Sequence, residues 1–236
     1  MSISEKILHP ASQVFRQIAT DPDWTFKIGI GCLINGAAFG LLLINLMLLP
    51  LCFCLWSLTA GYILMTVSAI VKEPECKLPT WQNLLELLIG GGIWLTVSVS
   101  HFLIPLLAGF ASLFLAESMG LDNCLKTCFL PWAISTWSVM IILAAVIAFF
   151  STYLMINFAV KQSIFAAFNI KDIASQLKRR PGALIQAWLL QAGLIYLAIL
   201  VPIATVVGIL IIPSTLFCAQ LIGSSILAHA WRDEVT

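Results

Sequence analysis

Long apolar runs alternate with short charged segments along the chain, and this alternation predicts membrane-spanning helices. Uncharged stretches cover residues 28–71, 87–116, 127–160 and 181–231. A helix needs about 20 apolar residues to cross the hydrocarbon core of a bilayer. The first and last stretches are about twice that length, so each predicts two helices joined by a tight turn. We expect these turns near Pro50 and near Gly208.

The pattern therefore predicts an all-α polytopic transmembrane bundle of six spans. The expected spans are 26–49, 51–71, 86–116, 130–160, 183–206 and 210–231. The third and fourth exceed one bilayer crossing, so they are single long helices or helices that overshoot the bilayer.

The charged segments divide the chain around these spans. We expect a cytoplasmic amphipathic lead over 1–25, spans one to four over 26–160, a basic amphipathic cytoplasmic linker over 161–182, a transmembrane hairpin over 183–231 and a cytoplasmic tail over 232–236. Of the 12 Lys and Arg residues, all but Lys126 fall on the side that holds both termini. This bias predicts cytoplasmic termini.

Two short sequence motifs predict where helices begin. Asp21-Pro22 combines a capping carboxylate with a Pro at the first helical position. Thr80-Trp81 follows Leu78-Pro79 and predicts another helix start, with Trp81 at the membrane boundary.

Composition excludes a soluble domain. The 236 residues are 61% apolar and 10% charged, with a mean hydropathy of +1.02. Soluble domains are about 45–50% apolar and about 25% charged. The net charge of +1 offers no bulk attraction to nucleic acid.

Cysteine placement favours packing over chemistry. Four of the seven cysteines lie inside apolar runs, where cysteine behaves as a small hydrophobe: Cys32, Cys52, Cys54 and Cys218. Cys124 and Cys128 share one short segment, which leaves a disulfide as an alternative. Without a nearby His the pair fits zinc poorly, so we expect no metal site.

The linker predicts an amphipathic helix. Ala166, Ile170, Ile173 and Leu177 recur at helical spacing, and polar residues occupy the other faces. Four of these polar residues are basic: Lys171, Lys178, Arg179 and Arg180. The alternatives are a topology signal on a soluble helix, docking on anionic lipid, or docking on a partner.

The two ends of the chain share a layout, which suggests a parallel hairpin repeat. Residues 12–71 and 164–231 each consist of an amphipathic segment, a Pro and a tight apolar hairpin. Few side chains match, so the expected repeat is one of architecture.

Several short motifs together carry a resemblance. They are Trp24-x-x-Lys27-Ile28-Gly29-Ile30-Gly31, Gly61-Tyr62, Leu78-Pro79-x-Trp81 and Gly90. In these motifs and in its six hydrophobic segments, the chain resembles the prokaryotic integral-membrane family catalogued as domain of unknown function 4013. The resemblance implies a bacterial or archaeal membrane protein, with cyanobacteria and their thylakoid membrane as a plausible source. It implies no activity.

Few residues in the spans could carry chemistry. The spans hold no charge away from their ends, which argues against an ion-coupled transporter. His101 lies four residues before Pro105, whose ring leaves the His101 carbonyl without a helical donor. His101 is either bonded to a neighbouring helix, a ligand of a metal, haem or pigment, or part of a substrate path. Asn35 and Gln191 are the other path candidates.

Enzyme motifs are absent, and loops of this length hold no catalytic domain, so we expect no catalytic residue. Small residues suggest close helix contacts instead, within the bundle or between subunits, at Gly29, Gly36, Gly40 and Gly90.

These features favour a non-enzymatic accessory, assembly or scaffolding subunit of a larger membrane complex. The alternative is a transporter or channel for a small neutral or lipid-like solute. The expected partners are membrane lipids and other membrane proteins, with bound lipid or pigment as the candidate cofactor and no nucleic acid.

Overall fold

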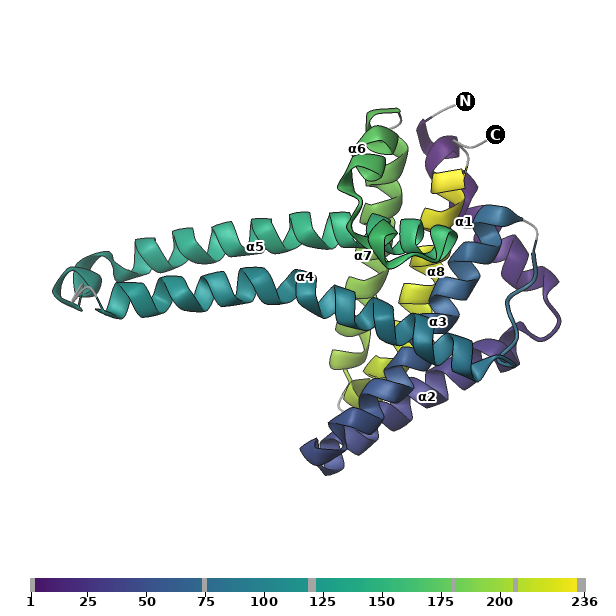
Figure 1. Cartoon of the computed structure of the whole chain (residues 1–236), viewed down its shortest axis with the longest axis horizontal. Helices are drawn as coiled ribbons and strands as arrows, with labels where there is room; N and C mark the ends of the chain where they lie inside the picture. Colours follow the sequence, from purple (N-terminus) through teal and green to yellow (C-terminus); the bar gives the residue numbers. More distant parts are fainter. Residues whose placement is uncertain (1–2, 74–75, 119–121, 180, 206–207, 233–236) are drawn as a thin grey trace. The chain divides into compact units, whose positions relative to one another are not determined.

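The computed structural model describes residues 3–73, 76–118, 122–179, 181–205 and 208–232, with side chains left out at 3–9, 102, 104–106, 108–118, 122–137 and 139–141. This part of the chain is helical and contains no strand. Its α-helices are α1 (Ile3–Thr20), α2 (Trp24–Ile44), α3 (Leu49–Lys72), α4 (Leu84–Ser118), α5 (Asp122–Lys161), α6 (Ile170–Arg179), α7 (Pro181–Ile203) and α8 (Ile212–Arg232) (Figure 1). The all-α prediction is confirmed.

Within the described residues, six helical segments are long and apolar enough to cross a membrane. They are Trp24–Ile44, Leu46–Lys72, Leu84–His101, Ile142–Lys161, Pro181–Ile203 and Gly208–Arg232. Six spans were predicted, and each predicted span overlaps one of these segments. The third and fourth spans belong to single long helices, α4 with 35 residues and α5 with 40.

The first hairpin turns earlier than the sequence analysis predicts. α2 ends at Ile44, a short 3-10 segment covers Leu46–Leu48, and Pro50 lies in the first turn of α3. The Asn45 side chain accepts a hydrogen bond from the backbone N–H of Met47 at 2.9 Å. Asn thus closes the turn by a side-chain bond to the backbone, while Pro starts the next helix.

The second hairpin closes in the predicted region. α7 ends at Ile203, a 3-10 segment covers Gly208–Ile211, and α8 begins at Ile212. The order helix, long helix, 3-10 turn, long helix therefore occurs at both ends of the chain. This order is the architectural repeat that the sequence layout predicts.

The chain forms two compact units. Unit 1 comprises Met1–Leu95 and Leu154–Thr236, and unit 2 is Thr96–Tyr153. In unit 1, α8 contacts α1, α2, α3 and α7, and most of its described side chains are buried. In unit 2, the distal parts of α4 and α5 run side by side as an antiparallel helical hairpin (Figure 1).

Close helix contacts in unit 1 occur at Gly31, Gly61 and Gly91. A Cβ on Gly61 would overlap the backbone of Leu87, and one on Gly91 would overlap the backbone of Ser57. α3 and α4 can therefore approach each other only because both positions lack a side chain. Gly31 likewise accommodates the ring of Phe217, from α8.

The glycines predicted for packing have more space. A Cβ on Gly29, Gly40 or Gly90 would meet no described atom within 4 Å, and one on Gly36 would reach the Ser214 hydroxyl at 3.6 Å. Helical geometry explains the difference, because Gly29 and Gly40 lie roughly on the opposite side of α2 from Gly31. Close packing within the chain is thus achieved elsewhere, and an inter-subunit role for these glycines stays a prediction.

Two cysteines from distant parts of the sequence meet between α2 and α8. The Sγ atoms of Cys32 and Cys218 lie 3.4 Å apart, and the Ser214 hydroxyl donates to the Cys32 carbonyl at 3.0 Å. Both thiols are free. The side chains of Cys124 and Cys128 lie outside the described residues.

The glycine contacts predict opposite effects of one substitution at two adjacent positions. Gly91→Ala places a methyl group against the Ser57 backbone and is expected to destabilise the protein by about 1–3 kcal/mol. Gly90→Ala meets open space and is expected to be neutral or stabilising, because Ala favours helix over Gly. The measurement is the free energy of unfolding in detergent. Equal effects of the two variants would contradict the α3–α4 contact.

Candidate functional site

A buried ion pair joins the end of α1 to the start of α2. The Lys27 ammonium lies 2.7 Å from an Asp21 carboxylate oxygen, and these residues are 8% and 1% exposed. Removing two charges from water is costly unless each is paired and hydrogen-bonded. Here Asp21 and Lys27 pair with each other, and the backbone of a third residue, Leu78, supplies further hydrogen bonds to both.

Leu78 binds both charged groups through its backbone. Its N–H donates to Asp21 Oδ2 at 3.0 Å, and its carbonyl accepts from Lys27 Nζ at 2.8 Å. The second carboxylate oxygen of Asp21 accepts from the N–H of Asp23 at 3.0 Å. We call the unit formed by Asp21, Lys27 and Leu78 the clasp. It fastens the loop between α3 and α4 to the start of α2.

Aromatic contacts continue the clasp into the bundle. The Trp81 indole N–H donates to the Lys27 carbonyl at 2.9 Å, and its ring stacks on Tyr62 with centroids 4.2 Å apart and planes within 4°. The Tyr62 hydroxyl donates to the Pro79 carbonyl at 3.1 Å. Phe217 of α8 lies 6.3 Å from the Tyr62 ring. The loop is therefore held against α2 and α3 by both polar and aromatic contacts.

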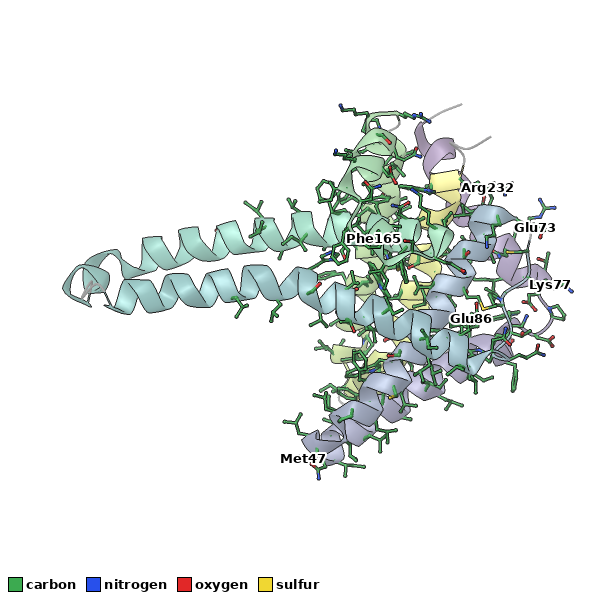
Figure 2. All side chains as sticks on the ribbon, viewed as in Figure 1. Met47, Glu73, Lys77, Glu86, Phe165 and Arg232 are labelled. Carbon is green, nitrogen blue, oxygen red and sulfur yellow. The ribbon has the colours of Figure 1, made fainter. Side chains whose placement is uncertain are left out.

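α1 contributes one more contact to this loop. The Gln17 amide donates to the Cys76 carbonyl at 2.6 Å. Glu73 and Lys77, at the start of the same loop, are exposed (Figure 2). Within this loop, Leu78 is thus buried in the clasp, whereas the charged side chains of Glu73 and Lys77 are exposed.

The clasp changes the titration of its carboxyl group. Burial raises the pKa of Asp21, but the Lys27 hydrogen bond and charge and the N–H groups of Asp23 and Leu78 together outweigh burial. The net pKa lies below the ordinary Asp value. Asp21 is therefore ionised at neutral pH, as the ion pair requires.

Two expectations for this region are wrong. α2 begins at Trp24, not at Pro22, so Asp21 is not the N-cap residue of α2. Its carboxylate pairs with Lys27 instead. α4 begins at Leu84, so Thr80-Trp81 does not start a helix, and the Trp81 ring packs on Tyr62. In both cases a contact distant in sequence overrides a local signal.

The clasp explains why scattered motifs occur together. Lys27, Gly61, Tyr62, Leu78 and Trp81 all belong to the motifs that carry the family resemblance, and the structure brings them to one place. Gly61 lies beside Tyr62 and against Leu87, at the start of α4. The motifs therefore define one structural unit.

Each of the three predicted path residues has a hydrogen-bond partner in the structure. Asn35 donates to the Gly31 carbonyl of its own helix at 3.1 Å. Gln191 donates to the Ser224 hydroxyl of α8 at 3.4 Å, and its amide oxygen is buried without a hydrogen-bond partner among the described residues.

His101 belongs to unit 2. Its Nδ1 lies 3.5 Å from the Ser151 hydroxyl, from α5. The structure thus pairs His101 with a neighbouring helix, which is one of the alternatives that the sequence left open. No group of three or more His, Cys, Asp or Glu side chains that could hold a metal occurs in the described parts of the chain.

The predicted basic surface lies on α6. Lys171, Lys178 and Arg179 are exposed, and Arg180 lies outside the described residues. Unlike the clasp, this surface is open to solvent or lipid.

The fold and its six apolar spans define a multi-pass helical membrane protein. Residues 41–212 match the family described as Protein of unknown function (DUF4013), and the chain belongs to that family. The match includes Gly61-Tyr62 and the Leu78–Trp81 motif and begins after the Trp24–Gly31 motif. No curated protein and no solved structure matches the chain.

The clasp predicts strong coupling between its two charges. Asp21→Asn leaves the Lys27 ammonium buried without a counter-ion, and Lys27→Met does the same to the carboxylate. Each is expected to reduce the free energy of unfolding by about 3–5 kcal/mol. The double variant is expected to lose less than the sum. Asp23→Asn, at an exposed neighbour with no capping bond, is the control. Additive losses would contradict the pairing.

The lowered pKa of Asp21 predicts a specific acid sensitivity. Its contribution to stability is complete above the ordinary Asp pKa of about 3.9 and is lost as pH falls through the lower, folded-state pKa. The wild-type free energy of unfolding is therefore expected to fall more steeply below about pH 4 than that of Asp21→Asn. Parallel acid profiles would show that the Asp21 carboxylate is not paired.

Proposed function

We propose that this protein is a non-enzymatic accessory, assembly or scaffolding subunit of a larger membrane complex. The observation that carries the proposal is the length of the apolar helices α4 and α5.

The two helices carry more apolar length than one bilayer crossing uses. The uncharged runs 87–116 and 127–160 rise about 45 Å and about 51 Å at 1.5 Å per residue. The hydrocarbon core is about 30 Å thick. Placing either run fully in hydrocarbon needs a tilt of about 50°, beyond the usual range of about 0–40°. Apolar surface is therefore left for a protein to cover.

Unit 2 presents that surface on both helices. On α4, Val99, Leu103 and Leu107 are exposed, and on α5 the exposed side chains include Ile142 and Val146. A large exposed apolar surface on a protein marks a site of interaction with another protein or with lipid. A helix of a partner membrane protein would cover it by lateral packing.

The rest of the chain supports a structural role. The buried ion pair fastens a loop to α2, and the described polar side chains of the path candidates bond to their own or a neighbouring helix. Gly29 and Gly40 leave room on α2 for close approach of a further helix, whereas Gly36 already lies against Ser214 of α8. Bound pigment or lipid would accompany such a complex.

The charge distribution and the resemblance support a location. We infer that both termini are cytoplasmic and that the protein resides in a prokaryotic inner membrane or a cyanobacterial thylakoid membrane. The excess of Lys and Arg on the side of the termini supports the orientation.

A transporter or channel for a small neutral or lipid-like solute is the second candidate. The buried, unpartnered amide oxygen of Gln191 supports it, because such an atom is a candidate binding group for a polar solute.

Photocrosslinking at matched positions tests the accessory role. Leu107 on α4 lies in the distal part of the uncharged run 87–116, and Leu197 on α7 lies inside the candidate span Pro181–Ile203; their side chains are 57% and 55% exposed. A photoreactive amino acid at Leu107 is expected to link one polypeptide, which also purifies stoichiometrically with the protein in gentle detergent. The same group at Leu197 is expected to link lipid.

Three results would contradict the proposal. Lipid adducts alone at Leu107, together with a colourless monomer, would favour the solute pathway. Adducts only to a second copy of this chain would indicate a homo-oligomer. Loss of a solute flux on Gln191→Leu, with the fold intact, would establish transport.

A further inference from the structure

The linker between α5 and α7 is a folded segment at the ends of two spans. It contains a 3-10 helix, Ile164–Phe168, followed by α6. The candidate span Ile142–Lys161 ends where it begins, and the span Pro181–Ile203 starts where it ends. The end of the first span and the start of the second lie on the same side of the membrane, because the linker joins them. The linker is therefore held at the membrane surface.

Specific bonds fix the shape of this linker. Gln162 turns the chain with a φ of 49°, and the Asn157 amide donates to the Ala166 carbonyl at 2.9 Å. Lys161 forms an ion pair with Asp172, whose carboxylate also accepts from the Asn169 amide. The negative charge of the linker is thereby paired internally.

The apolar residues of the linker divide between two sides. Ala166, Ala167 and Ile173 are buried against the protein. The predicted continuous stripe is therefore corrected in part, because Ile170 of that stripe is 56% exposed. Ile170 is the first residue of α6, whereas Ile173, one turn further along the same helix, is buried.

The exposed side is both aromatic and basic. Phe165, which is labelled in Figure 2, is 88% exposed, and Ile164, Phe168 and Ile170 are also exposed. Lys171 follows Ile170 directly, and Lys178 and Arg179 lie two turns further along α6. We call these residues the linker surface. Apolar side chains beside cations are the pattern of segments that lie in the bilayer interface.

We propose that the linker surface docks on the anionic headgroups of the adjoining leaflet. Phe165 and its apolar neighbours enter the boundary between headgroups and acyl chains, and Lys171, Lys178 and Arg179 contact lipid phosphates. Charge complementarity selects anionic over zwitterionic lipid, at about five-fold per cation near the surface. This proposal does not rest on the accessory role.

Lipid crosslinking in defined vesicles tests the docking. The purified full-length chain, carrying benzoylphenylalanine in place of Phe165, is reconstituted in equal parts phosphatidylcholine and phosphatidylglycerol. Phosphatidylglycerol adducts are expected to exceed phosphatidylcholine adducts by at least about five-fold, the preference that a single cation gives. The triple variant Lys171→Gln, Lys178→Gln and Arg179→Gln is expected to bring the ratio to about one.

A second triple variant provides the matched control. Arg16→Gln, Lys72→Gln and Lys77→Gln remove the same charge at exposed positions outside the linker and are expected to leave the ratio unchanged. The proposal is overturned if the wild-type ratio is one, if no lipid adduct forms, or if both triple variants act alike. A polypeptide adduct replacing lipid in native membranes would also overturn it and assign the surface to a protein. None of these outcomes depends on Leu107, so the accessory role is tested separately.

Discussion

The buried pair of Asp21 and Lys27 is the interaction on which unit 1 depends. Neither charge could stay out of water alone, and neither is satisfied by the other alone. The backbone of Leu78 completes both sets of hydrogen bonds, so the pair is stable only when the loop after α3 is in place. The pair therefore makes the junction of α1 and α2 and the loop between α3 and α4 mutually dependent.

Packing extends this dependence through the bundle. Trp81 reaches back to the Lys27 carbonyl and stacks on Tyr62, which also lies near Phe217 of α8. The next residues of the chain enter α4. This helix can approach α3 closely only because Gly61 and Gly91 carry no side chain. A membrane offers little hydrophobic drive for helix association, so such close contacts and satisfied polar groups provide the specificity.

The sequence predicts the spans well because a bilayer imposes one simple requirement, a sufficient apolar length. It predicts the clasp poorly because Asp21 and Lys27 have convincing local roles, as a helix cap and as a topology charge. The residue that both of them bind, Leu78, lies more than fifty positions away in the sequence. It is bound through its backbone, so the identity of its side chain does not indicate the contact. The joint occurrence of the Lys27, Tyr62 and Trp81 motifs was the available signal. The linker stripe is corrected only at Ile170, which is exposed at the first residue of α6, whereas Ala166 and Ile173 are buried as predicted.

The central claim is that the clasp holds the loop after α3 on α2, and amide hydrogen exchange at Leu78 tests it most directly. In the folded protein the Leu78 N–H is bonded to a buried carboxylate, whereas the neighbouring Lys77 is exposed. Residue-resolved exchange of the protein in nanodiscs is expected to show Leu78 strongly protected and Lys77 exchanging fast. Asp21→Ala is expected to remove the protection at Leu78. Equally fast exchange at both positions in the wild-type protein would contradict the account.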